Sequence, residues 1–165
     1  MTAVATEFTL ATKPGALTEF TDELSTWVRS QSIRIGQCAL WLRHTSAGLI
    51  ICENADPDVL RDLRRFLWDL APDGDPRYIH TAEGPDDMSA HVKSVLTGCQ
   101  LTIPVVDGRL QLGTCQGGFV WEFRAQAHRR RVSVSLVGDE RAWLAPGWDC
   151  PAGVLPCPVS RVESV

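Results

Sequence analysis

The chain has 165 residues, 44% of them hydrophobic and 22% charged, which is enough apolar material for one domain with its own core. Its net charge of −4 argues against a nucleic-acid binder, because such a protein needs a basic face. No segment approaches the roughly 20 apolar residues of a membrane-spanning helix. Residues 1–10 contain no Lys or Arg, so we expect no secretory signal, no membrane partner and a cytoplasmic location.

The six cysteines contain no Cys-x-x-Cys pair, which argues against a zinc ribbon and against a thioredoxin-like motif. We expect reduced, buried thiols, as is usual in a reducing compartment. The alternative is a structural disulfide, for which Cys150 and Cys157 are the favoured pair.

The first part of the chain shows strand and helix periodicities in turn. Alternation predicts a strand over Val4–Leu10, and apolar residues at helical spacing predict an amphipathic helix over Leu17–Arg29. Alternation returns over Ile33–Arg43, and a second strand, Ala47–Glu53, follows the polar turn at residues 44–46. Because strands adjacent in sequence often pair, we expect antiparallel neighbours here.

Two helices are predicted next. Asp56 can cap a helix that begins at Pro57 and keeps an apolar stripe as far as Leu70. Residues 71–84 form a loop, and a shorter helix follows over Asp86–Thr97.

The remaining part of the domain shows strand patterns, and Asp107-Gly108 is a tight-hairpin signal between the first two. The predicted strands are Gln100–Val106, Arg109–Leu112, Gly118–Ala125 and Arg131–Val137. The order β-α-β-β-α-α-β-β-β-β predicts a single α+β domain with a largely antiparallel or mixed sheet and about three helices.

The composition changes after residue 140. Residues 141–165 contain four of the ten prolines, two of the six Trp and two of the six Cys. We therefore divide the chain into a domain of residues 1–140 and a C-terminal extension of residues 141–165. The extension either wraps the domain, docks on an oligomer partner or is partly disordered, and its Trp content favours docking.

Three histidines lie in short polar segments: His44 in a turn, His80 in the long loop and His91 on the short helix. Asp87 precedes His91 by four residues and shares its helix face. Three converging neutral imidazoles suit Zn²⁺ or a similar divalent ion with an open position. The spacing alone leaves a second interpretation, in which these are ordinary surface or hydrogen-bonded histidines.

Acidic residues accompany these histidines. Asp86 and Asp87 begin the short helix, where acids also stabilise the positive helix end. Glu122 lies within an apolar strand, so it either pairs with Arg124 on a solvated face or lines a pocket with a raised pKa.

Four motifs in chain order resemble the YjbQ-type family, often called secondary thiamine-phosphate synthase. The motifs are His44-Thr45-Ser46-Ala47-Gly48, ENADPDV at residues 53–59, EGPDDMSAH at residues 83–91 and GRLQLGTCQG at residues 108–117. The resemblance is collinear from about Phe8 to Glu140 and leaves out the extension.

The resemblance implies an α+β fold, a homotrimer and a divalent metal ion, Zn²⁺ or Mg²⁺, at His44, His80 and His91. Other polar positions match the family and are candidate catalytic residues. These are Glu53, Asn54, Asp87, Gln116 and Glu122.

The implied reaction joins a hydroxymethylpyrimidine diphosphate to a thiazole phosphate and releases pyrophosphate, as a secondary activity. The ion would stabilise the leaving diphosphate, with Glu122 or Asp87 handling a proton or orienting a ligand. Candidate phosphate contacts are Arg43, Lys93 and Arg109. Two other classes stay open: a metal-dependent hydrolase of a small phosphorylated substrate, and a non-catalytic trimeric protein that binds a metal or metabolite.

Three residues depart from the family pattern. Ser89 stands where the family usually has Pro, Cys115 where it has Trp, and Gly118 where a larger apolar residue is common. We expect the last two to reshape the wall of the site and so to alter the inherited substrate choice.

Overall fold

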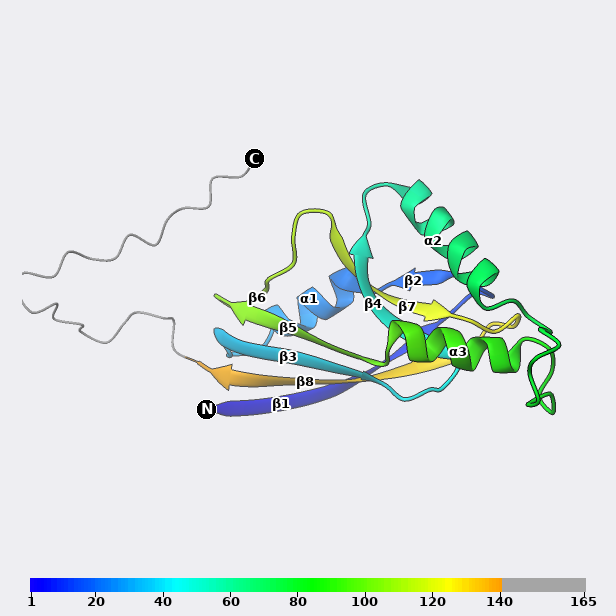
Figure 1. Cartoon of the computed structure of the whole chain (residues 1–165). Helices are drawn as coiled ribbons and strands as arrows, with labels where there is room; N and C mark the ends of the chain where they lie inside the picture. The colour runs from blue at the N-terminus through cyan, green and yellow to red at the C-terminus, as the bar shows by residue number, and fades with distance from the viewer. Residues whose placement is uncertain (141–165) are drawn as a thin grey trace, which may run out of the picture.

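Eight strands divide between two antiparallel sheets in the computed structural model, which describes residues 1–140 (Figure 1). The five-stranded sheet has the order β1-β8-β3-β5-β6, and the three-stranded sheet has the order β2-β7-β4. The larger sheet contains β1 (Thr2–Ala11), β3 (Ile35–Leu42), β5 (Gln100–Val106), β6 (Arg109–Leu110) and β8 (Arg129–Asp139). The smaller sheet contains β2 (Leu17–Glu19), β4 (Ala47–Glu53) and β7 (Gln116–Glu122). The helices of the described residues are α1 (Thr21–Arg29), α2 (Pro57–Leu70) and α3 (Asp87–Thr97).

The predicted α+β class is therefore confirmed, with three helices in residues 1–140. The proposed extension at residues 141–165, with Cys150 and Cys157, lies outside the described residues. Among the described residues, no helix is both long enough and apolar enough to cross a membrane.

The main core lies between the inner faces of the two sheets and α1. Leu24 and Val28 of α1 pack there with Leu40 of β3, Leu49 of β4 and Val134 of β8, all nearly inaccessible to solvent. β3 and β8 bury every second residue over most of their length, as the period of two of a strand requires.

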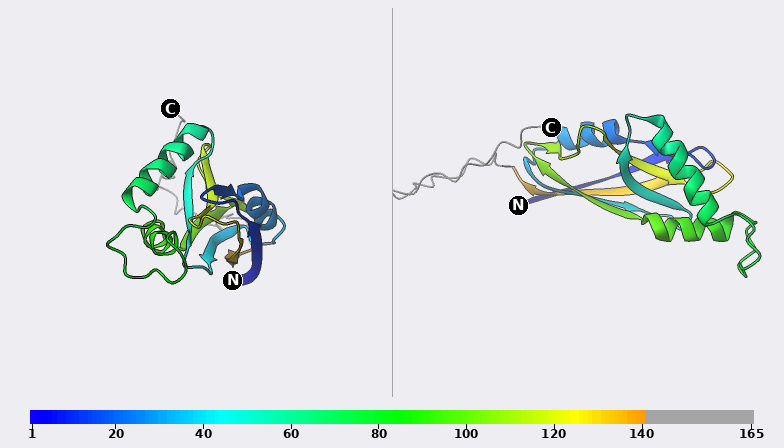
Figure 2. Two further views of the ribbon diagram at one scale, coloured as in Figure 1. Left: turned by 90° about the vertical axis from the view of Figure 1, so that its right-hand side faces the viewer. Right: turned by 45° about the horizontal axis from the view of Figure 1, so that its top comes forward.

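A smaller core lies on the other face of the three-stranded sheet, beneath α2 and α3. Its buried residues are Leu67, Ala90, Trp121 and Phe123. The three-stranded sheet is thus covered on both faces. The outer face of the five-stranded sheet carries no helix among residues 1–140 (Figures 1 and 2).

The helix predicted over Leu17–Arg29 is wrong in its first turn. Leu17–Glu19 instead forms β2, which pairs with Phe119–Trp121 of β7, and α1 begins only at Thr21. The N–H of Phe20 donates to the carbonyl of Gly118 at 3.1 Å, which continues this strand contact. Pairing with β7 therefore overrides the local helical periodicity.

The expectation that neighbouring strands pair is right for one connection and wrong for another. β5 and β6 form the predicted hairpin, with Asp107 and Gly108 at φ values of 52° and 70°. β3 and β4 do not pair, because the turn at residues 44–46 carries the chain from the larger sheet to the smaller. This crossing places the turn beside α3.

The predicted start of α2 is confirmed, but its apolar stripe is not fully buried. Asp56 accepts a hydrogen bond from the N–H of Asp58 at 2.8 Å, and Pro57 is the first helical residue. Leu67 is buried, whereas Phe66 remains 68% exposed. The helix thus contacts the smaller core along a narrower stripe than its sequence predicts.

Candidate metal centre

Three side chains meet where the loop at residues 71–86 joins α3. Asp87 and His91 lie four residues apart on α3 and therefore share one face of the helix. The loop adds His80, whose Nε2 lies 2.8 Å from Oδ2 of Asp87. Nε2 of His91 lies 3.3 Å from the same oxygen. One potential ligand atom from each residue lies within 4.8 Å of the other two.

A backbone carbonyl orients the imidazole of His91. Nδ1 of His91 lies 2.9 Å from the carbonyl oxygen of Thr45. A carbonyl only accepts hydrogen bonds, so Nδ1 carries a proton, and Nε2 is the nitrogen that faces Asp87. This is the arrangement in which a neutral histidine binds a metal ion.

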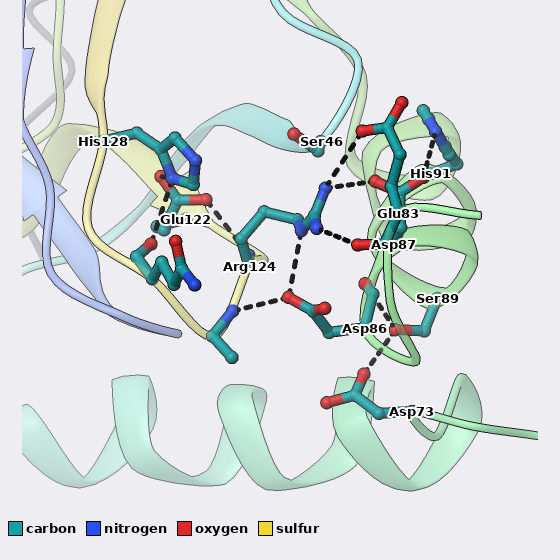
Figure 3. A network of polar contacts seen from close by, with 12 residues as sticks. Ser46, Asp73, Glu83, Asp86, Asp87, Ser89, His91, Glu122, Arg124 and His128 are labelled. Carbon is teal, nitrogen blue, oxygen red and sulfur yellow. Dashed lines mark hydrogen bonds and ion pairs between the residues drawn. The ribbon is translucent and has the colours of Figure 1, made fainter. Parts of the chain in front are cut away.

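Arg124 orients the carboxylate of Asp87, which is 2% exposed (Figure 3). One guanidinium nitrogen binds Oδ1 of Asp87, which leaves Oδ2 to the two histidines. The guanidinium also donates to the carbonyl of Glu83 at 2.8 Å. Arg124 therefore joins the end of β7 to the segment that carries the group.

Asp86 is the N-cap residue of α3, but its side chain makes no capping hydrogen bond. Its Oδ2 instead accepts hydrogen bonds from Nε of Arg124 at 2.9 Å and from the N–H of Ala125 at 2.8 Å. Burial alone raises the pKa of Asp86, but these two donors outweigh burial and hold the pKa below its ordinary value. Asp86 thus serves as an anchor for Arg124.

The donor set fits a divalent ion that accepts nitrogen ligands. Two imidazole nitrogens and one carboxylate oxygen form a common zinc set, whereas Mg²⁺ prefers oxygen ligands and water. The side chains of His80 and His91 are 45% and 34% exposed, so the group is open on its histidine side. An open position is typical of catalytic rather than structural zinc sites.

His44, predicted as the third imidazole ligand, is not part of this group. Its Nε2 accepts a hydrogen bond from the N–H of Arg131 at 2.8 Å, so its proton lies on Nδ1. Burial lowers the pKa of His44, and the positive charges of Arg130 and Arg131 lower it further. The imidazole is therefore held neutral in the turn that leads to Thr45.

Glu122 is fully buried, and its partner is not the one expected from the sequence. Arg130 binds both carboxylate oxygens, with Nε at 2.8 Å from Oε2, while the side chain of Arg124 points to Asp86 and Asp87. Burial alone raises the pKa of Glu122, but hydrogen bonds from Arg130 and Thr12 outweigh it and leave the pKa lowered. Neither alternative from the sequence holds, because Glu122 does not lie on a solvated face and its pKa is not raised.

A sequence model of the UPF0047 protein YjbQ-like family matches residues 6–139. The chain belongs to this family. It is 47% identical over 130 residues to the UPF0047 protein sll1880 of Synechocystis sp. This alignment covers 79% of this chain and 88% of that relative. It is 39% identical over 132 residues to the UPF0047 protein YjbQ of Escherichia coli O157:H7. This alignment covers 79% of this chain and 95% of that relative.

A solved structure from Clostridium acetobutylicum, described as an uncharacterized conserved protein of the YjbQ/UPF0047 family, has the same fold. It is 33% identical, covers 80% of this chain and 99% of its own, and superposes with a TM-score of 0.73. These descriptions name no activity. The function of this UPF0047 family member is therefore to be inferred from the chemistry of its site.

Three of the predicted polar site residues lie at the other end of the smaller sheet. Glu53 pairs with Gln116 at one end of the β4–β7 ladder, and Ala47 pairs with Glu122 at the other. Six residues at about 3.3 Å each separate these ends by about 20 Å. Asn54 lies beyond Glu53, so within one chain these residues do not reach the histidine–aspartate group.

The departures Cys115 and Gly118 lie at that same distant end. The carbonyl of Cys115 accepts the N–H of Asn54 at 3.0 Å, and Cys115 is exposed. A Cβ at Gly118 would meet Phe20 at 3.8 Å, an ordinary van der Waals contact. Within one chain, neither residue forms a wall of the histidine–aspartate group.

The candidate phosphate contacts are also separated by the fold. Lys93 is 0% exposed and its Nζ lies 3.2 Å from Asp73, so the expectation that it contacts a phosphate is wrong. Arg43 is paired with Glu7 at 2.9 Å near the turn at residues 44–46. Arg109 lies in the β5–β6 hairpin, at the opposite end of the larger sheet.

Sequence reasoning missed Arg124 and Thr45 as groups that orient potential ligands. In the sequence, Arg124 is notable only as a neighbour of Glu122. Its contacts with Asp86, Asp87 and the carbonyl of Glu83 depend on the fold. Thr45 acts through a backbone carbonyl, for which side-chain chemistry gives no signal.

Proposed function

We propose that this family member is a metal-dependent enzyme for a small phosphorylated substrate, with His80, Asp87 and His91 as metal ligands. The observation that carries the proposal is the convergence of two imidazoles and one buried carboxylate at a group open to solvent. Asp87 is a buried carboxylate with Arg124 on one oxygen and two histidines on the other. Its orientation is therefore fixed before a metal ion binds.

The substrate chemistry that we propose is thiamine-phosphate formation, as the family resemblance implies. The thiazole nitrogen attacks the methylene carbon of the pyrimidine, the C–O bond to the diphosphate breaks, and pyrophosphate leaves with the electron pair. A bound divalent ion would neutralise the charge that develops on the leaving diphosphate.

The protein contributes position and charge to this reaction. Arg124 and the carbonyl of Thr45 hold the acidic and imidazole ligands in place. Arg129 and Arg131 are exposed on β8, next to the turn at residues 44–46, and would attract an anionic substrate to this end of an acidic protein.

A metal-dependent hydrolase is the second candidate, because an open metal position also admits water. The two functions are separated by incubating metal-loaded protein with hydroxymethylpyrimidine diphosphate, with and without thiazole phosphate. Pyrophosphate release that requires thiazole phosphate and yields thiamine phosphate supports the transferase. Release without thiazole phosphate identifies a hydrolase, and no release from metal-loaded protein contradicts both.

His91→Ala is the test variant for this assay, and His128→Ala is its matched control. His91 is a proposed ligand, whereas His128 is a half-exposed histidine outside the group. We expect His91→Ala to lose activity and His128→Ala to keep it. Equal activity of the two variants would contradict the assignment of this site as the active site.

We also propose a homotrimer in the cytoplasm. The outer face of the larger sheet supports self-association, because small uncharged residues occupy neighbouring strands there: Ala5, Ser135, Ala39 and Thr102 follow one another across β1, β8, β3 and β5. Such small side chains allow close approach of another subunit. The free thiols of Cys38, Cys52, Cys99 and Cys115 fit a reducing compartment.

A further inference from the structure

Glu122 is a buried carboxylate whose two oxygens are both bound by donors of the protein. Oε2 accepts hydrogen bonds from Thr12 Oγ1 at 2.7 Å and from Nε of Arg130 at 2.8 Å. Oε1 accepts the N–H of Arg124 at 3.0 Å and a second nitrogen of Arg130. Because both oxygens are occupied and the side chain is 0% exposed, Glu122 does not meet a substrate proton.

We propose that Glu122 is a positioning residue that orients two of the three proposed metal ligands, His91 and Asp87, through separate contacts. This inference rests on the proposed metal centre. It assigns Glu122 a role in the affinity and geometry of metal binding rather than in proton transfer.

The first connection runs through Arg130 to His91. Arg130 is 4% exposed, and the guanidinium that binds Glu122 also donates to Ser46, to the carbonyl at 3.2 Å and to Oγ at 3.1 Å. Ser46 follows Thr45, whose carbonyl accepts a hydrogen bond from Nδ1 of His91. The ion pair thus fixes the turn that selects the tautomer and ring orientation of His91.

The second connection runs through Arg124 to Asp87. Glu122 binds the backbone N–H of Arg124, at the point where β7 ends. The guanidinium of the same residue binds Asp86 and Asp87 (Figure 3). The carboxylate of Glu122 therefore helps to place the cation that orients Asp87.

A purely structural role explains this arrangement less well. A buried ion pair often stabilises a fold no better than apolar residues of similar size, because both charges lose their hydration. Glu122 and Arg130 instead make hydrogen bonds to Arg124 and to Ser46, in the two segments that orient the proposed ligands. Groups that orient metal ligands in this way usually change metal affinity about 10–100-fold when they are replaced.

Metal binding by the full chain tests the proposal, with Co²⁺ and Zn²⁺ as probes. Co²⁺ is titrated by its visible absorption, which reports the coordination geometry, and Zn²⁺ is titrated against a chelating dye. We expect Glu122→Gln to weaken both affinities about 10–100-fold and to change the Co²⁺ spectrum. Glu7→Gln, which removes the exposed ion pair with Arg43, is the matched control and should bind like the wild type.

A second variant separates orientation from folding. The double change Glu122→Gln, Arg130→Met removes both buried charges together, so no uncompensated ion remains in the core. We expect it to fold, as judged by circular dichroism, and to show the same weakened binding and altered Co²⁺ spectrum. If Glu122→Gln is unfolded, the double variant decides.

The outcomes distinguish the two proposals. Absence of Co²⁺ and Zn²⁺ binding by the wild-type chain contradicts the metal centre itself. Wild-type binding together with unchanged affinity and an unchanged Co²⁺ spectrum in a folded Glu122 variant overturns the positioning role alone.

Discussion

Arg124 binds Oδ1 of Asp87 and thereby leaves Oδ2 of the same carboxylate to the imidazoles of His80 and His91. The guanidinium also pairs with Asp86, so one cation balances two acidic side chains that are only 2% and 14% exposed. The start of α3 is therefore held in place by Arg124, which follows the end of β7 and is far from α3 in the sequence.

Replacing Arg124 with Met should therefore destabilise the metal-free protein. The change leaves Asp86 and Asp87 without their cation, and breaking a buried pair in this way costs about 3–5 kcal/mol. Urea unfolding of the metal-free chain measures the loss. Arg61→Met is the control, because its ion pair with Asp58 is exposed and should contribute less than about 1 kcal/mol. Equal effects of the two changes would contradict the importance of the Arg124 contacts.

Metal content should separate the proposed ligands from His44. We expect His80→Ala, Asp87→Asn and His91→Ala to lose most of the bound Zn²⁺ after equilibrium dialysis, since each removes one of three ligand atoms. His44→Ala should retain it, because the Nε2 of His44 is occupied by the N–H of Arg131. Loss of Zn²⁺ from His44→Ala equal to the loss from His91→Ala would restore His44 as a ligand.

The position of His91 beside Asp87 could be predicted from the sequence, whereas the position of His44 could not. The spacing of Asp87 and His91 on one helix face is a local property, and the structure confirms that they meet. The position of His44 depends on the crossing between two sheets, which the alternation of β3 and β4 does not reveal. The same crossing puts the carbonyl of Thr45, rather than the ring of His44, beside the group.

Register explains the other difference between sequence and structure. Alternation predicts that Glu53 and Glu122 lie in strands, but only the pairing of β4 with β7 shows that they lie at opposite ends of one ladder. In the same way, Glu122 selects Arg130 because β8 passes beside it, although Arg124 is closer in sequence. Local patterns thus predict elements, and long-range pairing decides which polar residues meet.

Stability should fall on acidification as His44 begins to bind a proton in the unfolded chain. Its folded pKa lies below the ordinary value of 6.5, so the unfolded state takes up protons first. The stabilisation is present above pH 6.5 and is lost as the pH falls from 6.5 toward the folded pKa. His44→Gln keeps an acceptor for the N–H of Arg131 without this titration. Urea unfolding at pH 7.5 and pH 5.5 should give a smaller decrease for His44→Gln than for wild type, and identical decreases would contradict the assignment.

Lys93 should tolerate an apolar replacement of similar length. It is fully buried, its Nζ lies 4.4 Å from the ring centre of Trp68, and burial lowers its pKa despite the contact with Asp73. Lys93→Met keeps the volume and the aromatic contact, so we expect a change in unfolding free energy below about 1.5 kcal/mol. Lys93→Ala leaves a cavity and should cost about 2–5 kcal/mol.

The pair of Lys93 variants also tests the phosphate role. Because Lys93 does not reach solvent, Lys93→Met should retain the Michaelis constant for the proposed phosphorylated substrate. A large rise in that constant without a loss of stability would show that Lys93 meets the substrate after all.

The patch of small uncharged residues on the outer face of the larger sheet should govern self-association. Ala39 lies at its centre, between Ser135 of β8 and Thr102 of β5, so an Arg there places a charge in any interface that uses this face. We expect Ala39→Arg to shift the proposed trimer to smaller species in light scattering at micromolar concentration. Ala55→Arg, in the exposed turn before α2, is the matched control and should keep the wild-type mass. Because the side chain of residue 39 points away from the core between the sheets, the variant chain should still fold, and an unchanged mass would exclude this face as the contact.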